Sequence, residues 1–102
     1  IASHRLIAKM PTLAAMAYKY NVGQPFVYPK NSLDYCANFL HMMFAVPAEQ
    51  YKIPQEIVEA LNLLLILHAD HELNASTFTA RVIAGTGADI YSAVAGAIGA
   101  IV

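Results

Sequence analysis

The chain has 102 residues, enough for one small domain, but 58% of them are hydrophobic and only 13% are charged. A protein of this size cannot bury so large an apolar fraction by itself, so we expect further polypeptide to cover part of it. The net charge of −1, with six scattered basic residues, excludes the cationic surface that nucleic acids or anionic membranes require. No segment reaches the roughly 18 uncharged residues of a membrane span.

Cysteine usage and the chain ends bear on the compartment and on completeness. The single cysteine, Cys36, cannot form an internal disulfide, which makes a reducing intracellular compartment the default expectation. We expect a cytoplasmic protein and leave the mitochondrial matrix open. Apolar periodicity runs up to both termini, with no initiator Met at Ile1 and no capping residue at Val102, so we expect an internal piece that is truncated at both ends.

Apolar spacing favours helices almost throughout, and no run alternates long enough to form a strand, so the sequence predicts an all-α fold class. The first helix should bury one face, formed by Leu6, Met10, Leu13, Ala14 and Ala17. Pro11 lacks an amide hydrogen and should kink this helix or make it restart. Residues 21–30, with two prolines and a glycine, are predicted to form a loop.

Asn31 or Ser32 should cap a second helix, which Pro47 ends. Its expected buried stripe is Leu33, Cys36, Ala37, Leu40 and Phe44, with Phe39 and Met43 beside it. A third helix should begin near Pro54, because proline suits the first helical turn. Residues 63–67 are apolar on every side, so we expect this helix to be covered all round.

Asn74 or Ser76 should cap a fourth helix that ends at Gly85 or Gly87, and Asp89 should cap a fifth. The fifth helix repeats a small residue at every fourth position, at Ser92, Gly96 and Ala100. Such a flat face allows another helix backbone to approach closely.

The polar segment 68–77 sets two imidazoles and two carboxylates between an apolar helix and a new helix start. His71 stands next to free amide hydrogens, where it can donate to an anionic ligand while the helix amides add partial positive charge. The residues alone leave open that His71 only satisfies backbone carbonyls. Asp70 and Glu72 fit general bases or residues favoured by the helix dipole. We expect no metal site, because the histidine spacing departs from the established zinc motifs.

The run His68-Ala-Asp-His-Glu leading into Asn74-Ala-Ser76 resembles the citrate synthase family, including its 2-methylcitrate synthase members. Further stretches are similar to family sequence, so the resemblance covers nearly the whole chain: Gly23–Pro29, Asn38–Leu40, Met42–Phe44 and Tyr91–Ala93. This resemblance implies that residues 1–102 are a partial domain, a multi-helical fragment of the citrate synthase large domain.

By the same resemblance, the full-length parent is an acyltransferase of the tricarboxylic acid cycle, citrate synthase. It condenses acetyl-CoA with oxaloacetate and water to give citrate and CoA, uses no cofactor, and forms a homodimer or higher homo-oligomer. His71 is then an oxaloacetate ligand, His68 and Asn74 are further candidate ligands, and Ser76 supports a catalytic histidine.

The resemblance places both catalytic histidines, the aspartate base and the arginines that hold oxaloacetate outside this chain. We therefore expect the fragment alone to be inactive.

Two alternatives stay open. Asn74–Thr79 and Asp89–Ala93 look as much like 2-methylcitrate synthases, which use propionyl-CoA, as like citrate synthases. A non-catalytic helical oligomerisation piece would also explain the small-residue face of the fifth predicted helix.

Overall fold

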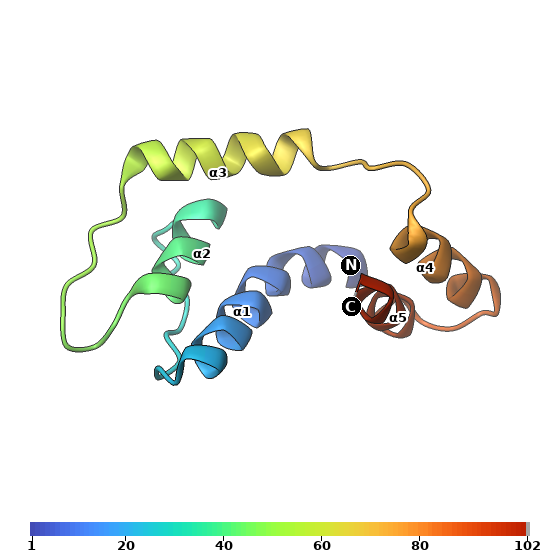
Figure 1. Ribbon diagram of the computed structural model, residues 1–102, viewed down its shortest axis with the longest axis horizontal. Coiled ribbons are helices and arrows are strands. Elements are labelled where there is room, and N and C mark those ends of the chain that lie inside the picture. Colours follow the sequence, from blue (N-terminus) through green and yellow to red (C-terminus); the bar gives the residue numbers. More distant parts are fainter. Residues whose placement is uncertain (102) are drawn as a thin grey trace. The chain divides into compact units, whose positions relative to one another are not determined.

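The computed structural model describes residues 1–101, which form five α-helices and no strand beyond an isolated bridge between Val46 and Glu49 (Figure 1). The helices are α1 (Ala2–Val22), α2 (Tyr35–Phe44), α3 (Gln55–Leu67), α4 (Ala75–Gly85) and α5 (Ile90–Ile101). This confirms the predicted all-α fold class. None of the described helices combines the length and apolar character needed to cross a membrane. The uncapped end expected at Val102 lies outside the described residues.

The chain divides into two compact units. Residues 4–67 contain most of α1 together with α2 and α3, and we call them the α1–α3 unit. The segment from His68 onward, with residues 1–3, contains α4 and α5, and we call it the α4–α5 unit.

Helix α2 is the centre of the α1–α3 unit, because α1 and α3 both pack against it (Figure 1). The core cluster consists of Cys36, Ala37, Leu40 and Val58. The predicted stripe is therefore confirmed at its middle. It is wrong at Phe44, whose side chain is 45% exposed, and it omits the buried Met42. Met42 is buried on the side of α2 that contacts α1, where the Thr12 hydroxyl donates to the Met42 sulfur at 3.6 Å.

The start of α2 differs from the prediction. Its N-cap is Asp34 rather than Asn31 or Ser32, and the Asp34 carboxylate accepts the Ala37 backbone N–H at 2.8 Å. The residues before it are held as a turn, because the Asn38 side chain pairs with both the N–H and the carbonyl of Lys30, each at 2.9 Å. This pairing satisfies backbone groups that an earlier helix start would have used.

A kink or a restart was predicted at Pro11; helix α1 runs through Pro11 without a restart, and its buried face is not the predicted one. The buried residues are Pro11, Ala15 and Lys19, whereas Leu13, Ala14 and Ala17 are exposed. The Lys19 ammonium donates to Gln24 Oε1 at 2.9 Å and to the Ala45 carbonyl at 2.5 Å, and these bonds hold this face of α1 toward the end of α2.

The C-terminal end of α1 explains how Gln24 reaches Lys19. Gly23 has φ +76°, a conformation that glycine adopts without steric cost. The chain therefore folds back, and the Gln24 N–H donates to the Lys19 carbonyl at 2.9 Å.

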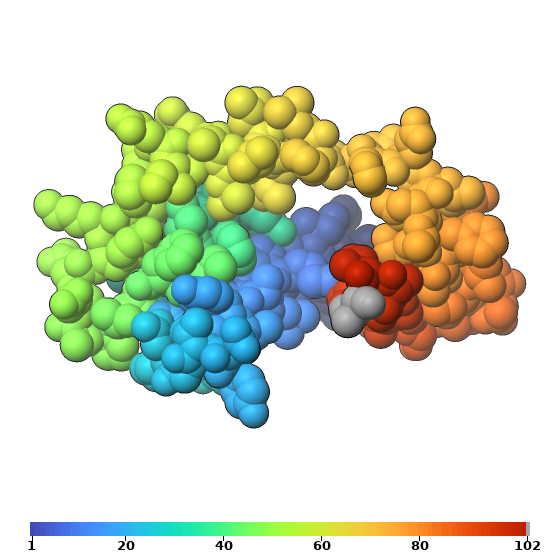
Figure 2. All heavy atoms as spheres, viewed as in Figure 1, coloured from blue at the N-terminus to red at the C-terminus, as the bar shows by residue number. Residues whose placement is uncertain are grey.

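Helix α3 starts where predicted, with the Pro54 carbonyl accepting the N–H groups of Ile57 and Val58. Its second half is not covered all round. Residues 63–67 are each between 48% and 68% exposed within the described chain, and Figure 2 shows α3 side chains at the surface.

Helices α4 and α5 pack against one another as a pair (Figure 1). Of the two candidates for the cap of α4, Asn74 takes the position and Ser76 lies inside the helix; the predicted cap of α5 is confirmed, since Asp89 accepts the Ser92 N–H at 2.7 Å. The predicted close approach occurs at Gly96, where an added Cβ would collide with the Ile83 side chain of α4. The small face is shifted from the predicted one. Ala93 is its buried member, while Ser92 and Ala100 are exposed.

Candidate functional site

The polar junction 68–74 links the end of α3 to the N-cap of α4, as the sequence predicted. Its backbone turns at Glu72, which has φ +59° and is the only non-glycine residue with positive φ among residues 1–101. The Asp70 carboxylate accepts the Glu72 N–H at 3.1 Å, and the Glu72 carbonyl accepts the Asn74 N–H at 3.1 Å. The peptide groups on both sides of Glu72 are therefore fixed.

Asn74 and Ser76 form a bonded pair at the start of α4. Asn74 Oδ1 accepts the Thr77 N–H at 2.8 Å and the Ser76 hydroxyl at 2.8 Å. Both side chains are half-buried. Since its hydrogen is engaged, the Ser76 hydroxyl is oriented and keeps its lone pairs for accepting a further hydrogen bond.

The two histidines of the junction are exposed. The His71 imidazole has no hydrogen-bond partner within residues 1–101. It lies three residues before the N-cap of α4, whose first amides carry partial positive charge. His71, Asn74 and Ser76 lie in one short segment of the chain, but among the described residues no hydrogen bond joins the His71 ring to the Asn74–Ser76 pair.

Ser76 also lines an open groove of about 420 Å³ between α4 and α5. The other lining residues are Thr77, Ala80, Arg81, Ala84, Ile90, Ala93, Val94 and Ala97. Arg81 is the only charged side chain among them, so the groove is mostly apolar.

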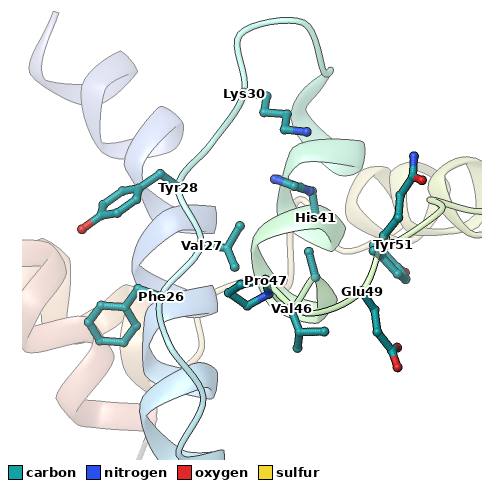
Figure 3. A pocket seen from close by; sticks show the side chains of 11 residues that line it. Phe26, Val27, Tyr28, Lys30, His41, Val46, Pro47, Glu49 and Tyr51 are labelled. Carbon is teal, nitrogen blue, oxygen red and sulfur yellow. The ribbon is translucent and has the colours of Figure 1, made fainter.

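A second cavity, of about 480 Å³, lies in the α1–α3 unit and was not predicted (Figure 3). It combines aromatic loop residues such as Phe26 and Tyr28 with Lys30 and with His41 of α2. Burial, and then the nearby Lys30 charge, hold the pKa of His41 below its ordinary value. None of the four predicted site residues lines this cavity. The aromatic residues between the prolines of the loop were the available signal for it.

Other reactive groups offer little chemistry. Cys36 is buried, with Sγ 4.0 Å from Asn62 Oδ1. Burial and the negative charge of Asp34 raise the pKa of its thiol, which disfavours the nucleophilic thiolate. Within residues 1–101, no three His, Cys, Asp or Glu side chains are grouped so that they could hold a metal ion.

Comparison with known proteins gives consistent matches. The family model described as citrate synthase, C-terminal domain, matches residues 1–102. The chain is similar to the crystal structure of citrate synthase from Pyrobaculum aerophilum, with 46% identity and a TM-score of 0.82 over 93% of this chain and 22% of that one. The Thermotoga maritima citrate synthase structure matches at 38% identity and a TM-score of 0.71, over 89% of this chain and 24% of that one. The chain therefore spans less than a quarter of either protein.

Proposed function

Because the chain belongs to the citrate synthase family, we propose that its full-length protein condenses acetyl-CoA with oxaloacetate and water to give citrate and CoA. The observation that carries this proposal is the family match over residues 1–102 together with the retained junction His68–Ser76. The reaction is an acyl transfer that proceeds by acid–base chemistry on the acetyl methyl group, without metal or prosthetic group.

His71 is proposed to bind oxaloacetate. A dianion is stabilised by hydrogen-bond donors and by the partial positive charge at a helix N-terminus, and His71 lies three residues before the N-cap of α4. Its exposure leaves both ring nitrogens available to a ligand. His68 is a further candidate ligand from the same junction.

Asn74 is suited to donate rather than accept in this site. Its Oδ1 is occupied by Thr77 and Ser76, so its amide hydrogens are the groups left for a carboxylate. Ser76 has an oriented hydroxyl whose lone pairs can accept an imidazole N–H. This supports a positioning role for Ser76 toward a catalytic histidine from another part of the protein.

We also propose that the full-length protein is an intracellular homodimer or higher homo-oligomer that pairs through α4 and α5. Large apolar side chains of these helices are about half exposed in the described chain: Phe78, Val82, Tyr91 and Ile98. Covering them in a second copy would remove apolar surface from water.

The test is oxaloacetate-dependent release of the CoA thiol by the purified full-length protein, with acetyl-CoA and propionyl-CoA compared. We expect kcat/KM for acetyl-CoA to exceed that for propionyl-CoA by about 10-fold or more, the discrimination typical of one methylene. The reverse preference would identify a 2-methylcitrate synthase. If the protein releases CoA from neither acetyl-CoA nor propionyl-CoA, a non-catalytic helical oligomerisation piece would be favoured.

A further inference from the structure

The ligand set proposed above leaves out Asp70, although this residue makes a specific contact beside His71. Its carboxylate accepts the N–H of Glu72, the residue that follows His71, at 3.1 Å. Asp70 is exposed, so this bond is not a consequence of close packing in a core.

Glu72 needs such support. Its φ of +59° is a left-handed conformation that crowds the side chain of an L-residue against its own backbone. Conformations of this kind persist where neighbouring contacts hold them. Here the N–H of Glu72 is held by Asp70 and its carbonyl by the Asn74 N–H.

We propose that Asp70 is a positioning residue for His71: by fixing the left-handed turn at Glu72, it sets the direction in which the imidazole leaves the backbone before α4. This inference rests on the proposed function. It assigns Asp70 neither proton transfer nor ligand contact. The role needs an acceptor oxygen at Asp70 and does not need a charge.

The test uses the full-length protein and steady-state kinetics. Asp70→Ala should raise the KM for oxaloacetate about tenfold while the KM for acetyl-CoA stays within about twofold. Asp70→Asn keeps Oδ1 as an acceptor, so its KM for oxaloacetate should stay close to that of the unmodified protein. In a double-mutant cycle, Asp70→Ala should add no further increase once His71→Ala is present, because Asp70 acts through His71.

The matched control is Asp89→Ala. It removes the same kind of carboxylate-to-backbone bond at the start of α5, so it should lower thermal stability without changing the KM for oxaloacetate. If Asp70→Ala folds poorly, adding Glu72→Gly supplies the second variant. Glycine adopts positive φ without the carboxylate, so the double variant should fold and should recover most of the lost oxaloacetate affinity.

The outcomes separate this inference from the function on which it rests. If His71→Ala leaves the oxaloacetate KM unchanged, the ligand assignment of the proposed function fails, and the inference fails with it. If His71→Ala raises this KM but Asp70→Ala does not, or if the two effects multiply in full, only the positioning role of Asp70 is overturned. An equal effect of Asp89→Ala would also overturn it, because general destabilisation would then explain the loss.

Discussion

The α1–α3 unit and the α4–α5 unit are held in different ways. In the first, contacts between residues far apart in sequence join the helices, as between Lys19 and Ala45 or between Thr12 and Met42. In the junction that opens the second, the side-chain bonds reach only two or three residues along the chain. Bonds between residues two or three apart in the sequence fix where a helix and its free amides begin. Contacts between residues far apart in the sequence decide which side of a helix is buried. We therefore expect changes in the junction to alter ligand binding, and changes in the α1–α3 unit to alter stability.

The largest expected effect is on ligand binding at the junction. In the full-length protein, His71→Ala should raise the KM for oxaloacetate about 10- to 150-fold, because a hydrogen bond that involves a charged group contributes about 1.5–3 kcal/mol. Steady-state kinetics with varied oxaloacetate measure this. The thermal midpoint should barely move, since His71 is exposed. If His71→Ala instead lowered stability strongly and left the KM unchanged, the junction would act on stability rather than on ligand binding, contrary to the contrast drawn between the two units.

The converse effect is expected at Lys19. Lys19→Met keeps most of the packing volume but leaves Gln24 Oε1 and the Ala45 carbonyl without their donor. The free energy of unfolding should fall by about 2 kcal/mol, measured by urea denaturation, while the KM for oxaloacetate is unchanged. Lys9→Met is the matched control, because Lys9 lies on the same helix but is exposed; its effect on stability should be within about 0.5 kcal/mol.

A smaller effect tests the packing of α4 against α5. Gly99→Ala should stabilise the protein by about 0.5–1 kcal/mol, because alanine is the better helix former and its Cβ would meet open space. Gly96→Ala should lose this gain, because its Cβ would displace the Ile83 side chain. Thermal unfolding of the two variants should differ by about 1 kcal/mol. Equal stabilisation by both would show that α5 does not lie this close to α4.

The smallest effect is a pH dependence in the α1–α3 unit. The folded-state pKa of His41 is lower than its ordinary value of about 6.5, first because of burial and then because of Lys30. Between these two pKa values the unfolded chain binds more protons than the folded chain, so stability falls as the pH drops through this window. His41→Gln should flatten the fall in the urea midpoint between pH 7.5 and pH 5.5. If the urea midpoint of the His41→Gln variant falls as steeply with pH as that of the unmodified protein, His41 is not the source of the pH dependence.

The junction was the part most open to prediction from sequence. Residue types and the helical periods that follow them predicted Asn74 or Ser76 as the cap of α4 and Asp89 as the cap of α5, and the structure selects Asn74 and confirms Asp89. The bond from Asp70 to Glu72 was not predicted, because it depends on a left-handed backbone that no glycine signals. The functional roles of His68, His71, Asn74 and Ser76 stay predictions.

In the α1–α3 unit, helix faces were harder to predict than helix existence. The apolar count on α1 favoured Leu13 and Ala14, yet the charged Lys19 is only 1% exposed, because a carbonyl at the end of α2 lies within its reach. The start of α2 was placed too early for a similar reason, since the pairing of Asn38 with Lys30 joins residues eight apart in the chain.

Sequence by itself determined the helical class, the caps of α4 and α5, and the polar junction between two helices, because these depend on the spacing of apolar residues and on side chains that bond to backbone only a few residues away. Tertiary structure alone decided which faces of α1 and α2 are buried and that Lys19 lies inside. Those features depend on the groups that distant segments bring within hydrogen-bonding distance, and the spacing of residue types does not encode such distances.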